Sequence, residues 1–110
     1  MNIFEEYLKE ITALILKNQK FLELKDLNKF KGVTVEVPPA EFNFELSCNV
    51  SLVLGKINKT NPKELANKIK YLIIKNLKVF NSVEIAGPGF INLKFTDNTI
   101  ISNINKILKS

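Results

Sequence analysis

The 110-residue sequence contains no histidine and a single cysteine, Cys48. Without histidine the chain cannot form an imidazole triad, a histidine metal site or an imidazole proton shuttle. One cysteine supports neither a zinc site nor an internal disulfide. No glycine-rich nucleotide-binding run is present, and the scattered acids form no persuasive acid–base pair. We therefore expect this chain to carry no catalytic residue, no metal site and no cofactor.

Long apolar runs and a secretory signal are also missing. No apolar segment approaches the ~20 residues that span a bilayer. The first ten residues, MNIFEEYLKE, carry acids where a secretory signal has basic residues. A lone cysteine agrees with a reducing compartment, so we expect a cytoplasmic protein with no membrane partner. With 45% hydrophobic and 25% charged residues, the composition is that of one soluble globular domain, residues 1–110.

The sequence also contains no arginine. The formal charge of +5 comes from sixteen lysines set against eleven acids. This balance weakly favours an anionic partner. Lysine acts as a point charge and lacks the guanidinium fork that reads guanine or grips phosphate at two points, so lysines would position a nucleic acid and not specify its sequence. The alternative is a solvated lysine surface that reflects codon usage, and the charge alone does not decide between them.

Hydrophobic periodicity organises the first half of the chain. A helix begins near Ile3 and ends near residues 17–20, because apolar residues recur every three or four positions. Residues 18–32 fit either a short helix or a packed loop. Residues 33–37 alternate as a strand that two prolines terminate, and a candidate second strand lies around residues 42–44. The first strand would place Val33, Val35 and Val37 inward, with Thr34 and Glu36 outward.

Capping residues indicate two helices in the middle of the chain. Ser47 is a candidate N-cap for a short buried helix with Gly55 near its end. Asn61 caps the next helix, since Pro62 occupies its first position and Glu64 completes a capping-box-like pair. The apolar stripe of that second helix consists of Leu65, Ile69, Leu72, Ile73 and Leu77.

The last third of the sequence predicts a hairpin and a terminal helix. Residues 83–86 and 90–95 form two strands joined by a tight turn at residues 87–89. A helix then starts at Thr96 or Asp97. One side of this helix carries Ile100, Ile101, Ile104, Ile107 and Leu108. The order of elements implies an α+β fold with two layers, a mainly antiparallel sheet with helices on one face.

The strand at residues 90–95 has two chemically different faces. Its period of two sends Ile91, Leu93 and Phe95 toward a core. The opposite face carries Phe90, Asn92 and Lys94, which could stack on a flat ligand, hydrogen-bond its edge and neutralise a phosphate. In an antiparallel sheet that second face can remain open to solvent. The alternative is that Phe90 packs under a loop or against the terminal helix.

Four segments of the sequence carry a family resemblance that extends over nearly the whole chain. VEVPP, ELSCNVSLVLGK, NPKELANKI and VEIAGPGFINLKF occur in that order, and together they resemble the N-terminal additional domain of bacterial-type arginyl-tRNA synthetases. The most specific parts are EIAGPGFIN and the segment N-V-x-L-V-L-x-K followed by Asn-Pro-Lys. Where the family commonly has Gly-Asp-Phe, this chain has Phe44, Glu45 and Leu46.

The resemblance implies a domain that docks on the elbow of tRNA-Arg, near the D-loop. In the family an aromatic and an amide two residues apart recognise a D-loop base, and here they match Phe90 and Asn92. The resemblance would place Lys94 near the tRNA backbone. Gly87 and Gly89 would let the chain approach the tRNA closely, although a hairpin turn also needs glycine backbone angles.

Four further residues are secondary candidates for tRNA contact. Asn49 could contact tRNA or hydrogen-bond within the start of its helix, and we favour the structural role. The other three, Lys56, Lys59 and Lys63, lie at the link between two helices. They could face phosphates, but a solvated turn is the more ordinary explanation.

The resemblance also implies that the chemistry lies elsewhere. The chain lacks the ATP-binding signatures of a synthetase, so residues 1–110 correspond to one domain of a longer enzyme that attaches arginine to its tRNA. ATP and magnesium would bind in the catalytic domain of that enzyme, which becomes a partner of this domain; DNA is not an expected partner. The alternatives are a non-catalytic protein-interaction or scaffold module of similar fold and, less favoured, a free-standing enzyme.

Overall fold

The chain begins with the helix that its apolar spacing predicts. In the computed structural model, which describes residues 2–109, helix α1 spans Ile3–Lys17. Asn2 caps it, because the Asn2 side chain accepts a hydrogen bond of 2.8 Å from the backbone N–H of Glu5. One face of α1 buries Tyr7, Ile11, Leu14 and Ile15. The remaining elements are the 3₁₀ helix η1 (Asn28–Phe30), β1 (Val35–Glu36), the 3₁₀ helix η2 (Ala40–Phe42), β2 (Leu46–Cys48), α2 (Val50–Asn58), α3 (Pro62–Asn76), β3 (Phe80–Ala86), β4 (Phe90–Phe95) and α4 (Asp97–Lys109).

The four strands form one antiparallel sheet in the order β1-β2-β4-β3. The hairpin of β3 and β4 is the predicted one, but β3 begins three residues before the expected start at Val83, with an irregularity between Phe80 and Ser82. This extension was missed because the irregularity breaks the period-two pattern. β2 pairs with β4, so strands far apart in sequence form the centre of the sheet.

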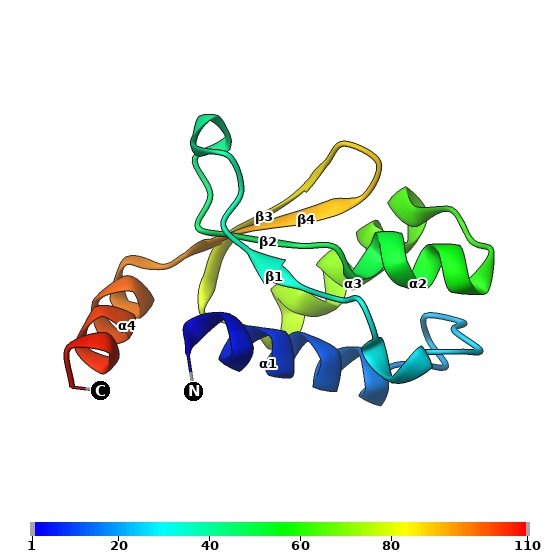
Figure 1. The fold of residues 1–110 in the computed structure, drawn as a ribbon, viewed down its shortest axis with the longest axis horizontal. Coiled ribbons are helices and arrows are strands. Elements are labelled where there is room, and N and C mark those ends of the chain that lie inside the picture. Colours follow the sequence, from blue (N-terminus) through cyan, green and yellow to red (C-terminus); the bar gives the residue numbers. More distant parts are fainter. Residues whose placement is uncertain (1, 110) are drawn as a thin grey trace.

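The sheet and three helices form two layers, which confirms the predicted α+β fold with helices on one face. In Figure 1, α1, α2 and α3 lie below the sheet, and the loop between β1 and β2 rises above it. The core between the layers contains Ile91 and Leu93 of β4, both fully buried. Tyr7, Phe80 and Phe95 extend it at the other end, with ring centroids 5.0–5.6 Å apart.

The prediction for residues 42–58 was correct for the short buried helix, which is α2, but wrong for the strand before it and for the Ser47 cap. Residues 42–44 form no strand; the strand is β2, and Ser47 lies in it. Helix α2 starts after Asn49, and it continues three residues past Gly55 to Asn58. Gly55 lies inside the helix, where the chain leading into α3 packs closely: an added Cβ would lie 3.2 Å from the Thr60 carbonyl oxygen and 3.3 Å from Cα of Pro62. Serine followed by an apolar run resembles an N-cap locally, whereas the pairing of β2 with β4 is a long-range contact.

The first strand is shorter than expected. β1 contains only Val35 and Glu36. Val33 and Val35 are buried as predicted, but Val37 is 66% exposed, against the prediction. The two prolines after Val37 lead the chain into the loop that contains η2, so its side chain leaves the core face.

The start of α3 confirms Asn61 as the cap, although among residues 2–109 the Glu64 carboxylate does not accept the reciprocal bond of a capping box. The Asn61 side chain accepts hydrogen bonds from the backbone N–H groups of Lys63 (2.9 Å) and Glu64 (3.2 Å). Pro62 occupies the first turn of the helix. The α3 stripe is buried at Leu65, Ile69, Leu72 and Ile73, which fixes α3 against the sheet below the β3–β4 hairpin.

Candidate nucleic-acid interface

A pocket of about 640 Å³ opens on the sheet face that the helices leave uncovered. One wall comes from the loop after β1 and the other from the turn of the β3–β4 hairpin, with side chains of the strands between them. Two segments widely separated in sequence therefore enclose one site. It is lined by Thr34, Glu36, Val37, Pro38, Pro39, Phe42, Ser47, Asn49, Ala86, Gly87, Pro88, Phe90 and Asn92.

The strand register brings polar side chains into one row across this face. Glu36 of β1 pairs with Ser47 of β2, Ser47 pairs with Asn92 of β4, and Asn92 pairs with Glu84 of β3. Directly paired residues project from the same face of a sheet, about 5 Å apart. The pocket therefore presents a carboxylate, a hydroxyl and an amide side by side, over a span of about 10 Å between Glu36 and Asn92.

Asn92 is the most unusual member of this row. The residue is only 3% exposed, yet no group within residues 2–109 hydrogen-bonds to its side-chain amide. Among residues 2–109 the fully buried side-chain atoms without a partner are the Ser51 hydroxyl oxygen and Nδ2 of Asn103. The Asn92 amide is not one of them, so it keeps some contact with solvent through the pocket. Asn92 lines the pocket, so its free donor and acceptor are available to whatever occupies that space.

Aromatic rings form part of the pocket wall. Phe90 is 40% exposed at the hairpin end, so it does not pack under a loop or against the terminal helix. Phe42, 46% exposed, contributes a second ring from the loop between β1 and β2. Exposed rings beside an unpaired amide are suited to a flat, hydrogen-bonding ligand, because the rings supply stacking area and the amide reads an edge.

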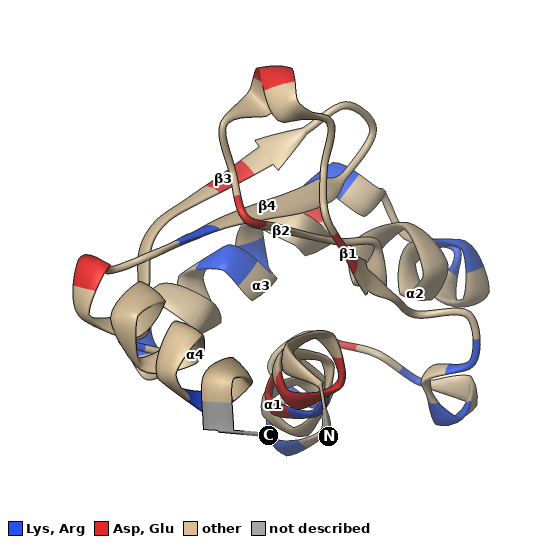
Figure 2. Cartoon of the chain, turned by 60° about the vertical axis from the view of Figure 1, so that its left-hand side comes forward, with Lys and Arg blue, Asp and Glu red and all other residues tan. Residues whose placement is uncertain are grey.

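The charge around the pocket is mainly acidic. Glu36 is the one ionisable residue among the side chains that line it. In Figure 2 acidic segments lie on the strands and at the tip of the β1–β2 loop, whereas lysine segments lie mostly on the helices and their connections. A carboxylate disfavours phosphate and favours N–H donors. The interior of the pocket is therefore suited to a neutral group with N–H donors.

Lys94 lies on the same strand face as Phe90 and Asn92 but outside the pocket lining. It is partly exposed, and it forms no ion pair within the part of the chain that the structure describes. The structure thus brings Phe90 and Asn92 together in the pocket and places a free cation two residues further along the strand.

The two hairpin glycines have different surroundings. Both have positive φ, +54° at Gly87 and +147° at Gly89, which L side chains rarely adopt. Gly87 lines the pocket. Gly89 is buried instead against the start of α3, where an added Cβ would lie 3.1 Å from Cβ of Pro62. The turn therefore rests directly on the residue that precedes Lys63.

Asn49 makes the structural contacts that we favoured. Its side-chain oxygen accepts a 2.7 Å hydrogen bond from the backbone N–H of Thr34, and its Nδ2 donates to the carbonyl of Gly32 at 3.0 Å. These bonds fix the start of β1 to the end of β2, although Asn49 also borders the pocket.

Three exposed lysines, Lys56, Lys59 and Lys63, lie along the end of α2 and the start of α3, outside the pocket.

Among the pocket residues that were not predicted as candidates are Glu36, Ser47 and Phe42. The alternation of its strand predicts that Glu36 points outward, and this pattern could have identified Glu36 as a candidate. Ser47 was missed because it was read as a helix cap. Phe42 was missed because a strand was expected where the chain forms η2.

Cys48 lies on the opposite face of β2 from the pocket and is fully buried. Burial raises the pKa of its thiol to about 12, so the reactive thiolate is scarce at neutral pH.

Within residues 2–109 no cluster of three or more potential metal ligands occurs. No helix in that range is long and apolar enough to cross a membrane.

The fold and the pocket define an open-faced α+β module with an aromatic and amide site, and comparison with known proteins places it in a family. Residues 2–95 match the family described as the arginyl tRNA synthetase N terminal domain. Because the match covers most of the chain, this chain belongs to that family.

Curated relatives agree with this assignment. The chain is 40% identical to an arginine–tRNA ligase of Pelagibacter ubique, with 96% of this chain and 19% of that protein covered. It is 38% identical to one of Prochlorococcus marinus (93% and 18% covered) and 33% identical to one of Rickettsia prowazekii (99% and 18% covered). The chain thus spans less than a fifth of the length of these relatives.

Proposed function

We propose that this chain is the tRNA-binding domain of a longer enzyme that attaches arginine to its tRNA, and that it binds the elbow of tRNA-Arg at the D-loop. Membership of the family and the named ligase activity of the relatives support the parent reaction. The chemistry, with its ATP and magnesium, then belongs to the remainder of that enzyme, including a catalytic domain that is the second partner of this chain.

The pocket receives one unstacked base of the D-loop. Phe90 stacks on the face of the base, and Asn92 hydrogen-bonds to its edge. The observation that carries this assignment is the Asn92 amide, which is 3% exposed, faces the pocket and has no partner among residues 2–109. A base edge supplies the donor and the acceptor that this amide lacks within the domain.

Glu36 adds a preference among bases. A carboxylate accepts hydrogen bonds and donates none at neutral pH, so it favours a base with an exocyclic amino group. Adenine, guanine and cytosine carry such a group, whereas uracil carries only a ring N–H at its pairing edge. We infer that the pocket selects an amino-bearing base at the D-loop position that it contacts.

Phosphates are held outside the pocket. Lys94 extends the Phe90–Asn92 row beyond it, and the hairpin turn rests on Pro62, beside Lys63. Lys56 and Lys59, at the end of α2, lie near Lys63 along the chain and add to the positive charge beside the pocket. Gly87 allows close approach of the D-loop at the pocket, and Gly89 holds the turn against α3. In this arrangement lysines position the RNA backbone and the pocket reads the base.

The test is tRNA titration of the longer enzyme with single substitutions. Phe90→Ala should weaken binding by ~1–3 kcal/mol, the typical value of a base–aromatic stack. Phe21→Ala is the matched control, because Phe21 is a similarly exposed ring (52%) that does not line the pocket. Glu36→Gln should reduce the preference for an amino-bearing base over uridine at the D-loop position.

Two results would overturn the proposal. The first is an equal loss of affinity in the Phe90 and Phe21 variants. The second is binding that barely changes as salt rises, because neutralised phosphates release counterions and make nucleic-acid binding steeply salt-dependent. Salt-independent binding would favour the protein-interaction module.

A further inference from the structure

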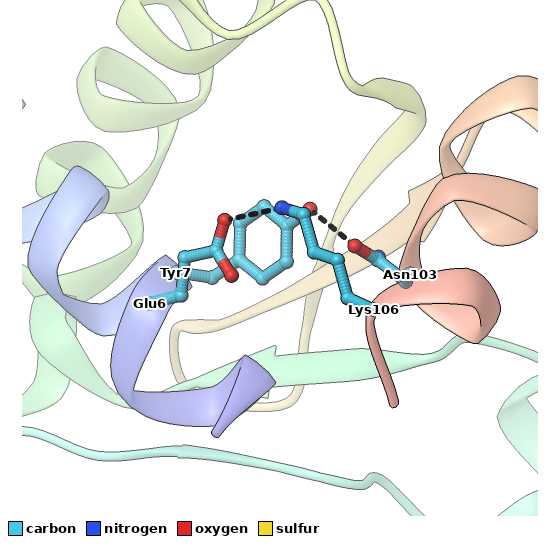
Figure 3. Close-up of polar contacts among 4 residues, drawn as sticks. All are labelled: Glu6, Tyr7, Asn103 and Lys106. Carbon is cyan, nitrogen blue, oxygen red and sulfur yellow. Dashed lines mark hydrogen bonds and ion pairs between the residues drawn. The ribbon is translucent and has the colours of Figure 1, made fainter. Parts of the chain in front are cut away.

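Helix α4 is attached to the rest of the domain along one side only. Asn103 is its one fully buried residue among 97–108, at 4% exposure, and its side-chain oxygen accepts a 3.3 Å hydrogen bond from the Tyr7 hydroxyl. Next to it, Lys106 forms a 2.9 Å ion pair with Glu6. Figure 3 shows both contacts bridging α1 and α4. They fix the orientation of α4 relative to α1.

Another side of α4 carries an exposed apolar stripe. Ile101, Ile104 and Leu108 are 58%, 50% and 77% exposed. At about 100° per residue these three side chains lie within about 60° of one another around the helix axis, on a different side from Asn103. In Figure 1, α4 stands at the left, apart from the layer of α1–α3. No element among residues 2–109 covers the stripe.

A groove lined by apolar and charged side chains lies beside α4. It measures about 650 Å³ and runs between the first turn of α1 and the last turns of α4. Leu46 and Phe95 of the sheet line it together with Phe4, which is 39% exposed. Ile107 of α4 also lines the groove, together with the charged residues Glu6, Glu45 and Lys106. Exposed apolar patches with a polar rim usually mark an interaction site.

The comparisons indicate what covers this surface. The family match ends at residue 95, one residue before the cap of α4, so α4 lies beyond the family domain. The relatives are about five times as long as this chain, which covers 18–19% of them. Because the family domain is named as N-terminal, α4 occupies the position between it and the rest of such an enzyme.

We propose that the α4 stripe and the adjoining groove dock against the domain that follows in the longer enzyme. This docking proposal rests on one part of the proposed function, namely that the chain is a domain of a longer enzyme. α4 then acts as a rigid connector: its stripe holds the following domain, and the contacts through Tyr7 and Glu6 hold the pocket domain. The connector fixes the distance and direction from the D-loop pocket to the remainder of the enzyme.

Amide hydrogen exchange of residues 97–108 tests the docking surface directly. We expect exchange to be at least ten-fold slower in the longer enzyme than in the 110-residue chain. The double variant Ile101→Lys/Ile104→Lys should abolish this difference without changing the melting temperature of the 110-residue chain. Ile74→Lys is the matched control, since Ile74 is an equally exposed isoleucine (51%) on α3.

Two outcomes would overturn the proposal. One is equal exchange of α4 in the two proteins. The other is a 110-residue chain that dimerises and becomes monomeric in the double variant, which would identify a second copy as the occupant. Neither measurement involves tRNA, so a failure of docking is distinguishable from a failure of the proposed tRNA binding.

Discussion

The two faces of strand β4 have different surroundings, because one packs into the core and the other borders the pocket. On the core face Ile91 and Leu93 are 0% exposed and packed among apolar side chains. On the other face Asn92 is 3% exposed, yet its amide has no hydrogen-bond partner within the described residues. Burial on the first face stabilises the fold. On the second face the Asn92 amide borders the pocket, so its donor and acceptor are available to a ligand.

The largest expected effect lies on the core face. Leu93→Ala should lower the free energy of unfolding by ~2–5 kcal/mol, because it leaves a cavity under the sheet. Urea denaturation of the 110-residue chain measures this loss. Ile101→Ala on the exposed side of α4 is the control and should change stability by less than ~0.5 kcal/mol. Similar losses for the two variants would show that the core is not where the structure places it.

Cys48 provides a pH probe of the same core face, since it pairs with Ile91. Burial raises its pKa from 9.0 to about 12, so the folded state keeps the thiol proton longer than the unfolded state does. The stabilisation is complete below pH ~9 and is lost as pH rises toward ~12, by up to ~1.4 kcal/mol per pH unit. Between pH 8 and 10.5 the unmodified chain should therefore lose ~2 kcal/mol more stability than Cys48→Ala. Parallel losses in the two chains would contradict the burial of this thiol.

A smaller effect is expected at Lys94 on the open face. Lys94→Ala should weaken binding of the longer enzyme to matching and non-matching tRNAs about equally. It should reduce the slope of log affinity against log salt by roughly one unit, as for the loss of one phosphate contact. Titrations at several salt concentrations give the slope. An unchanged slope would place Lys94 away from the RNA backbone.

The sequence predicted features that depend on neighbouring residues. The two faces of β4 follow from strict alternation after a glycine turn, and the start of α3 follows from Asn61 and Pro62, whose capping is completed within three residues. The hairpin, the α+β class and the aromatic–amide pair on one strand face were therefore all accessible from local patterns.

Features created by long-range contacts were not predictable in the same way. Ser47 resembles a helix cap in its local sequence, and its role as a strand residue appears only when β2 pairs with β4. Val37 was placed inward because alternation cannot show that the following prolines redirect the chain. The second wall of the pocket depends on that loop, so Phe42 and the burial of Asn92 emerge only from the folded structure.

The most direct test of the difference between the two faces is Asn92→Leu, which replaces the amide with an apolar side chain of similar size. Because the Asn92 amide has no hydrogen-bond partner among residues 2–109, this change should alter the free energy of unfolding by less than ~1 kcal/mol. The same variant in the longer enzyme should lose its discrimination among bases at the D-loop position. Urea denaturation of the 110-residue chain and tRNA titration of the enzyme supply the two numbers. A destabilisation of ~2 kcal/mol or more with base discrimination intact would show that Asn92 serves the fold and not the site.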